Sequence, residues 1–294
     1  MSMERPFYTK QPIPLLITIL IVLVVGTVTV PQDVLLADVG GLLGLWATGE
    51  TQVSWLTDPA PAGNGYAAAT EDPAEYEEPD PARTEAPKDN GKPMIALTFD
   101  DGPSRYTDRI LDLLEKHGGR ATFFVLGNRV ESWQDTIIRA VNIGSEIAGH
   151  SWSHPELTRL NDEQITQEIR DTSAIIEQIA GVSGRFFRPP FGRVDEQVVN
   201  VSNTLGYSIV NWTLDTQDWK HRNANSVYNA IMRGVQEGSI VLMHDIRTTT
   251  ATAMERVIPA LIAKGYQLVT VSELLHSLYG ELEPGRVYGI PGMR

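Results

Sequence analysis

Residues 93–104, PMIALTFDDGPS, indicate the fold class of the chain. Its apolar part, Met94–Phe99, predicts a buried β-strand, because a short apolar run followed by turn residues is typical of one. Asp100 and Asp101 follow the run directly, and Gly102-Pro103 then imposes a turn. The stretch therefore predicts a strand that delivers two adjacent carboxylates to the edge of a sheet.

The same alternation of short apolar runs and helical-period segments continues along the chain. The segment Ile165–Ile179 carries apolar residues at helical spacing, and Asn161 with Gln164 predicts the start of its helix. Further strands are predicted at Ala121–Val125, Glu146–Gly149, Phe186–Phe187, Ser208–Val210, Ser239–Met243 and Gln267–Val271. Such alternation is typical of an α/β fold with a parallel sheet, open or closed into a barrel.

Polar side chains follow several of these strands. They are His150 and His154, Arg188, Asp215 and Asp218 with Trp219, and His244 with Asp245. Each motif alone is more typical of a turn, a rigid loop or a surface pair. In a parallel α/β fold, however, sites form where the carboxyl ends of the strands meet, so together the motifs predict an active site.

The residue types at these positions favour hydrolysis. One carboxylate and two imidazoles are a common shell for a divalent metal with open coordination positions. The second aspartate of the pair can act as a base on water, and a later histidine can protonate a leaving amine. These are the groups that amide or ester hydrolysis requires.

Five ordered segments resemble the motifs of the polysaccharide deacetylase family, also called the NodB-homology or carbohydrate esterase family 4 group. The segments are TFDDGPS (98–104), HSWSH (150–154), RPPFG (188–192), DTQDW (215–219) and LMHD (242–245). The resemblance covers about Pro93 to Tyr279. It implies a distorted (β/α) barrel, usually with seven strands, and N- or O-deacetylation of sugars.

The resemblance also implies a role for each matched residue. Asp100 would be the catalytic base, oriented by Arg188. Asp218 would hold and tune His244, the general acid. The metal ligands would be Asp101, His150 and His154, and the ion would be Zn²⁺, with Co²⁺ and Mn²⁺ as alternatives.

Three residues would bind the substrate. The backbone N–H of Phe191 would stabilise the oxyanion, and Trp219 and Leu242 would wall the acetyl pocket. Phe191 departs from the family pattern, in which many members carry Tyr. The backbone N–H donor is the same for either residue, so this role would be unaffected. Asp215 is interpreted as a residue that supports the site without contacting metal or substrate. Three histidines match no motif and are interpreted as surface or structural residues, namely His117, His221 and His276.

The N-terminal part predicts a membrane anchor. Ile13–Val30 is almost wholly apolar, and about 20 such residues cross a ~30 Å hydrocarbon core. Arg5 and Lys10 precede the run and Asp33 follows it, so the positive-inside rule places the rest of the chain outside the cell. A cleaved signal peptide, which would make the protein secreted, is the main alternative.

The chain is therefore expected to have four parts. Residues 1–32 form a cytoplasmic tip and a single transmembrane anchor, and residues 33–92 form a juxtamembrane segment with a Pro/Ala/acidic linker. Residues 93–280 form the deacetylase domain, and residues 281–294 form a C-terminal tail. Within the linker, Glu50–Glu85 holds nine acidic residues and one basic residue, a composition typical of a disordered tether.

The composition excludes some functions. The chain has no cysteine, which rules out disulfides, a cysteine nucleophile and cysteine zinc ligands. The net charge of −13 argues against nucleic acid as a partner, and the sequence shows no obligate protein partner. The expected partners are a polysaccharide substrate and, through the anchor, the membrane.

Two other classes remain as alternatives. Two histidines and a carboxylate also suit a non-haem iron oxygenase, although the paired aspartates argue against it. A catalytically inactive glycan-binding module would need neither Asp100 nor His244. For the deacetylase, peptidoglycan N-acetylglucosamine is the first choice of substrate. Chitin oligomers, poly-N-acetylglucosamine and acetylxylan remain open, and N-acetylmuramic acid is less favoured.

Overall fold

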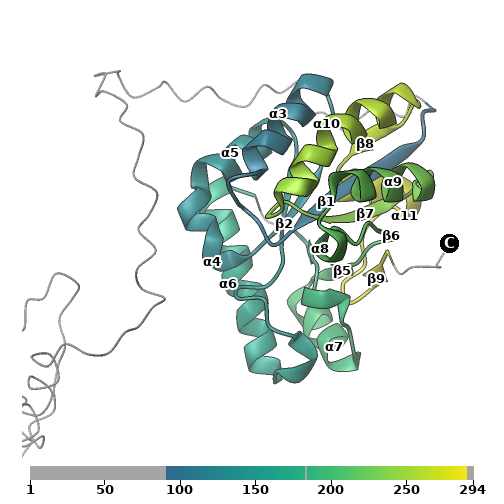
Figure 1. Ribbon diagram of the computed structural model, residues 1–294. Coiled ribbons are helices and arrows are strands. Elements are labelled where there is room, and N and C mark those ends of the chain that lie inside the picture. Colours follow the sequence, from purple (N-terminus) through teal and green to yellow (C-terminus); the bar gives the residue numbers. More distant parts are fainter. Residues whose placement is uncertain (1–90, 183, 290–294) are drawn as a thin grey trace, which may run out of the picture. The chain divides into compact units, whose positions relative to one another are not determined.

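The computed structural model describes residues 91–182 and 184–289 (Figure 1). The expected anchor at Ile13–Val30 and the linker up to residue 90 lie outside these ranges. Within the described ranges, no helix has both the length and the apolar character that a membrane span requires.

Nine strands form one curved parallel sheet among the described residues (Figure 1). Its order is β6-β7-β1-β2-β3-β4-β5-β9, and β8 pairs with the first half of β1. The bounds are β1 Met94–Asp100, β2 Thr122–Val125, β3 Glu146–Gly149, β4 Phe186–Phe187, β5 Ser208–Val210, β6 Leu214–Asp215, β7 Ile240–His244, β8 Gln267–Val269 and β9 Val287–Tyr288.

The seven predicted strands are all present, with bounds that differ by at most two residues at an end. The structure adds β6 and β9, which are too short to produce a periodic pattern in the sequence. The described strands do not close into a seven-stranded barrel, because β6 and β9 form the two ends of the sheet.

Strand β9 lies in the segment that was expected to be a C-terminal tail. It pairs with β5, and Tyr288 is buried against the apolar residues on one face of the sheet. The burial of this aromatic side chain explains why the sheet extends past residue 280.

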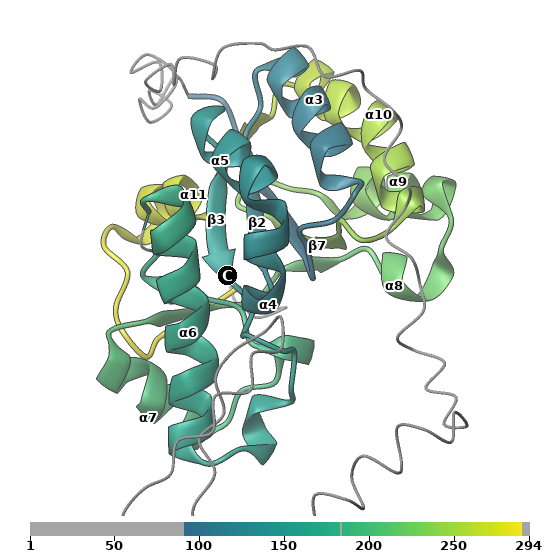
Figure 2. The ribbon, with the colours of Figure 1, turned by 90° about the vertical axis from the view of Figure 1, so that its left-hand side faces the viewer.

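Helices pack against both faces of the sheet. They are α3 Thr107–His117, α4 Gly127–Val130, α5 Gln134–Asn142, α6 Asp162–Ala180, α7 Glu196–Leu205, α8 Asp218–His221, α9 Ala224–Gly234, α10 Thr248–Ala263 and α11 Val271–Tyr279. Figure 2 shows α4, α5 and α6 over β2 and β3. The predicted start of α6 is confirmed, because Asn161 and Gln164 form a reciprocal capping box.

The alternation of side chains along β1 separates the core from the site. Ile95, Leu97 and Phe99 face the helices and join the main apolar cluster, where Phe99 stacks on the ring of Phe123. Since successive side chains of a strand point to opposite faces, Thr98 and Asp100 face the inner side of the curved sheet. The core therefore fixes β1 and, with it, the position of Asp100.

Candidate active site

Asp100 is held by a buried arginine. The Nη1 of Arg188, which follows β4, lies 2.6 Å from Oδ1 of Asp100 and also donates to the Thr98 hydroxyl. The rest of the guanidinium donates to the backbone oxygens of Val210 and Asn211. Arg188 is fully buried and Asp100 is 2% exposed, so the carboxylate is fixed in one orientation.

Asp101 points into a different environment from its neighbour. Its φ of 73° lies in the left-handed region, which non-glycine residues adopt at a cost of roughly 1–3 kcal/mol. His154 and Phe191 have φ values of 64° and 61°. Strained backbone of this kind clusters at functional sites, and here it occurs at three residues that line one pocket.

Asp101, His150 and His154 form a group that could hold a metal ion. One candidate ligand atom of each lies within 4.8 Å of the others. Oδ1 of Asp101 is 3.2 Å from Nε2 of His154 and 3.5 Å from Nε2 of His150. This oxygen is buried, and no donor among the described residues meets it in hydrogen-bond geometry. Ligand atoms of these types that lie close together without hydrogen-bond geometry fit a cation between them.

The ionisation of the group also fits a metal. Burial lowers the pKa of His150, which favours the neutral imidazole that a metal requires. Its Nδ1 lies 2.7 Å from the backbone oxygen of Arg188, which leaves Nε2 free to face Asp101. Burial alone would raise the pKa of Asp101, but the imidazoles of His154, His150 and His244 outweigh it and lower the pKa to about 2.

A residue that the motifs did not indicate holds the loop between the two histidines. Oε2 of Glu168, in the middle of α6, accepts the backbone N–H groups of Trp152 at 2.7 Å and Ser153 at 2.9 Å. Its Oε1 accepts the Ser153 hydroxyl. A glutamate within a long amphipathic helix has no sequence signal that distinguishes it from a surface residue.

His244 forms a second pair with a buried carboxylate. Its Nδ1 lies 2.8 Å from Oδ1 of Asp218, and its backbone N–H donates to Oδ2 of the same residue. Thr250 also donates to Oδ2. Burial alone would lower the pKa of His244, but the hydrogen bond and charge of Asp218 outweigh it and raise the pKa to about 9. The imidazole is therefore protonated at neutral pH.

The two pairs meet in the sheet. Asp100 and His244 are register partners in the parallel pairing of β1 with β7. A pocket of about 410 Å³ opens at this point. Its lining consists of Asp100, Asp101, His150, His154, Phe191, Trp212, Asp215, Trp219, Leu242, His244 and Arg247. The structure thus brings together the predicted base, acid, metal ligands and pocket walls.

The pocket wall contains exposed aromatic rings. Phe191 is 60% exposed and Trp219 is 47% exposed, and Phe191 packs edge-to-face against His154. Leu242 and Asp215 also line the pocket, and Trp212 and Arg247 were not anticipated there. Arg188 and Asp218 lie behind the lining, in contact with Asp100 and His244. His117, His221 and His276 are not among the lining residues.

Asp245 does not line the pocket although it follows His244 directly. It is fully buried, where it accepts the Thr107 hydroxyl at 2.5 Å. A Cβ at Gly102 would lie 2.2 Å from Oδ2 of Asp245, so only glycine fits between the aspartate pair and this carboxylate. Asp245 therefore supports the turn that follows Asp101.

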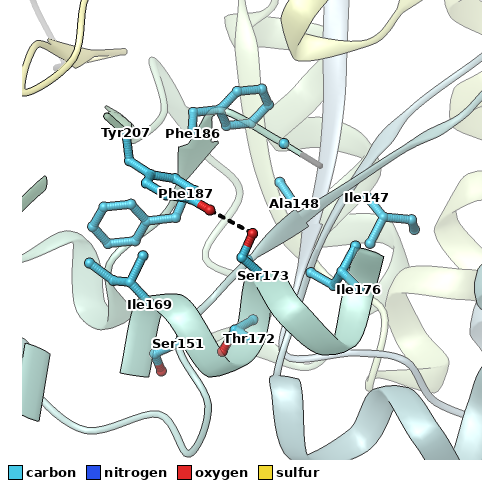
Figure 3. Close-up of a pocket in the computed structure, with 12 residues that line it drawn as sticks. Ile147, Ala148, Ser151, Ile169, Thr172, Ser173, Ile176, Phe186, Phe187 and Tyr207 are labelled. Atoms are coloured by element: carbon cyan, nitrogen blue, oxygen red, sulfur yellow. Dashed lines mark hydrogen bonds between the residues drawn. The ribbon is translucent and has the colours of Figure 1, made fainter. Parts of the chain in front are cut away.

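A second cavity lies between α6 and strands β3 and β4. Figure 3 shows that it is lined mainly by apolar side chains, including Ile147, Ile169 and Phe187, with the Tyr207 hydroxyl donating to Ser173. Its volume is about 10 Å³, which is close to the space of one water molecule. Of these two cavities, only the pocket at the strand ends has room for a sugar.

A model of the polysaccharide deacetylase family matches residues 87–210. The peptidoglycan-N-acetylmuramic acid deacetylase PdaC of Bacillus subtilis is 43% identical over 187 residues, which are 63% of this chain and 39% of that protein. This chain thus spans about two fifths of the length of that relative. A peptidoglycan-N-acetylglucosamine deacetylase of Bacillus cereus is 35% identical over 192 residues, which are 63% of this chain and 90% of that protein.

A solved structure is similar in fold and sequence. The family 4 acetyl xylan esterase from Clostridium thermocellum, in complex with a cobalt ion, superposes with a TM-score of 0.62 at 36% identity. The match covers 68% of this chain and 100% of the esterase chain.

Proposed function

Because the chain belongs to the polysaccharide deacetylase family, we propose that it is a metal-dependent hydrolase that removes N-acetyl groups from a cell-envelope polysaccharide. The observation that carries this proposal is the register of β1 with β7. It places Asp100, held by Arg188, beside His244, held by Asp218, in a pocket that also contains a group of potential metal ligands. A module that only binds glycans has no use for this pairing.

The proposed steps assign one proton transfer to each pair. Asp100 accepts a proton from the water that attacks the acetamide carbonyl, and Arg188 keeps the carboxylate oriented toward that water. His244, charged at neutral pH, donates its proton to the amine as the carbon–nitrogen bond breaks. Asp218 holds the imidazole in place and stabilises its charge. The products are acetate and the free amino sugar.

The residues present fit a divalent cation, which Asp101, His150 and His154 would hold. When bound, such an ion polarises a carbonyl and makes water a stronger acid. We propose Zn²⁺, because its preferred ligands include two imidazoles and a carboxylate with an open position. Co²⁺ and Mn²⁺ are the alternatives.

The pocket walls are assigned to substrate binding. Trp219 and Phe191 offer exposed ring faces on which a sugar ring can stack. Leu242 closes the pocket around the acetyl methyl group, and the backbone N–H of Phe191 donates to the developing oxyanion. We place peptidoglycan N-acetylglucosamine first as the substrate, supported by the Bacillus cereus relative named for it. Chitin oligomers, poly-N-acetylglucosamine, N-acetylmuramic acid and acetylxylan are the alternatives.

Mass spectrometry of glycans after incubation with the purified chain tests the function. Peptidoglycan should lose acetyl groups, chelation should stop the loss, and added Zn²⁺ or Co²⁺ should restore it. Full activity in protein shown by elemental analysis to be metal-free would contradict metal dependence. If the protein binds metal and the acetyl content of every glycan stays unchanged, the proposed deacetylase function is contradicted.

We also propose that the active site works outside the cell. The apolar run Ile13–Val30, with Arg5 and Lys10 before it, supports a single-pass anchor in the cell membrane. In this topology, the deacetylase domain and its proposed substrate, peptidoglycan, lie on the same side of the membrane.

A further inference from the structure

Arg247 lies in the candidate pocket without a charged partner. It follows β7 by three residues and lines the same pocket as His244, Trp219 and Asp101. Its Nε is buried and has no hydrogen-bond partner. Among residues 91–182 and 184–289, no aspartate or glutamate forms an ion pair with Arg247. The guanidinium therefore has an unused directional donor in the part of the molecule where substrate must bind.

Two other arginines of the domain, by contrast, have evident structural partners. Arg188 is saturated by Asp100 and three further oxygens, and Arg109 pairs with Glu255 on α10. The acids of the pocket do not neutralise Arg247 either. Asp100 is engaged by Arg188, Asp101 belongs to the ligand group, and Asp215 accepts the backbone N–H of Gln217.

The position of Arg247 on its helix also lacks a structural reason. Arg247 is the N-cap of α10, where it makes no capping hydrogen bond, and the first turn of α10 contains no acidic residue. A cation is unfavourable at a helix N-terminus, because the helix dipole places partial positive charge there. A bound anion would be favoured by both the guanidinium and the dipole.

We propose that Arg247 binds a carboxylate carried by the glycan within about one sugar of the acetamide that is cleaved. Arginine suits this task, because its planar fork donates two parallel hydrogen bonds to a carboxylate. The inference rests on the proposed function and narrows its substrate class. It selects carboxylate-bearing glycan, as in peptidoglycan, over neutral chitin oligomers and acetylxylan.

Two sources can supply the carboxylate in peptidoglycan. One is the lactyl ether of a muramoyl sugar that carries no peptide, and the other is an acidic residue of the stem peptide. Three substrates separate these sources: peptide-free strands, strands with stem peptides, and N-acetylglucosamine oligomers, which are neutral. Peptide-free strands whose lactyl carboxylate has been reduced to an alcohol provide a matched neutral control.

The test compares kcat/KM of the wild type with Arg247→Gln and Arg247→Lys. Arg247→Gln should lose about 10- to 100-fold on the carboxylate-bearing strands, mainly through KM, because a hydrogen bond to a charged group is lost. It should change about threefold or less on neutral oligomers. Arg247→Lys should recover part of the loss. Arg256→Gln, which makes the same charge change on α10 outside the pocket, should behave as wild type on all substrates.

Equal losses on neutral and charged glycans, or no loss on either charged strand, would overturn the inference. Binding measured in Asp100→Asn, where hydrolysis is slowed about 10²- to 10⁴-fold, separates this result from failure of the proposed function. In that variant, peptide-free or peptide-bearing strands should bind more tightly than the reduced strands, and adding Arg247→Gln should abolish the difference. If the difference persists with Gln at 247, Arg247 is not the carboxylate site, whether or not acetate is released.

Discussion

Nδ1 of His150 lies 2.7 Å from the backbone oxygen of Arg188, whose side chain holds Asp100 at 2.6 Å. One residue therefore orients a candidate metal ligand with its main chain and the candidate base with its side chain. The guanidinium also stacks on the ring of Phe124, at 3.8 Å from the ring centre. The two functions of Arg188 can be separated, because a substitution changes the side chain and leaves the carbonyl in place.

Arg188→Lys should separate the base from the metal site. Lysine keeps a positive charge but cannot donate at once to Asp100, Val210 and Asn211. We expect turnover to fall about 100-fold or more while metal affinity stays within about threefold. Unpaired backbone oxygens should cost about 1–3 kcal/mol in the free energy of unfolding. Acetate release, metal titration and urea unfolding measure the three effects, and a parallel loss of metal would refute the separation.

Asp218→Asn should change the pH dependence of the reaction. Asp218 contributes most to the raised pKa of His244, about 9, through its hydrogen bond and its charge, so the pKa should fall when that charge is lost. Because His244 must be protonated to act as an acid, the alkaline limb of kcat/KM should move to lower pH, by about one unit or more. Asp215→Asn removes a carboxylate from the same pocket without touching His244, and its alkaline limb should stay in place. If the alkaline limb of the kcat/KM profile does not move in Asp218→Asn, a group other than His244 titrates in that pH range.

Glu168→Ala should weaken metal binding without removing any ligand. It takes away the acceptor for the backbone N–H groups of Trp152 and Ser153, so the loop that carries His154 loses its anchor to α6. We expect metal affinity to fall about 10-fold or more, as is typical when outer partners of ligands are removed. Glu177→Ala, an exposed position on the same helix, is the matched control. Equal metal isotherms for both variants would show that the anchor is dispensable.

The anchor prediction is tested by fractionation of cells. The chain should sediment with membranes, and protease added outside should release the domain by cutting within Thr48–Lys92. The reason is that Ile13–Val30 can span the hydrocarbon core while the acidic linker has no composition for a packed core. A mature N-terminus located after Val30 would indicate a secreted enzyme instead.

The sequence predicted the fold and the pocket residues more fully than the residues that hold the pocket loops in place. Asp100, His150, Arg188 and His244 could be placed together, because each follows a strand and parallel strands end at one edge of a sheet. Glu168 could not be found in this way, since its partners are backbone groups of a loop distant in sequence. Strand β9 was not predicted from the sequence, because its two residues are too few to show an alternating pattern.

Arg247 shows a different limit of sequence reasoning. Its position three residues after His244 was visible in the sequence, but a surface arginine and a pocket arginine have the same pattern there. Only the burial of Nε and the lack of a partner distinguish the two.

Paired metal titrations of Asp100→Asn and Asp101→Asn separate the roles of the two adjacent aspartates. Acetate release is measured on the same sample as each metal titration. Asp100→Asn should bind metal like the wild type and lose about 10²- to 10⁴-fold in turnover, because only the general base is removed. Asp101→Asn should bind metal more weakly and regain part of its activity in excess metal. Loss of metal in Asp100→Asn with retention in Asp101→Asn would reverse the assignment, and retention of both metal and activity in both variants would contradict the site.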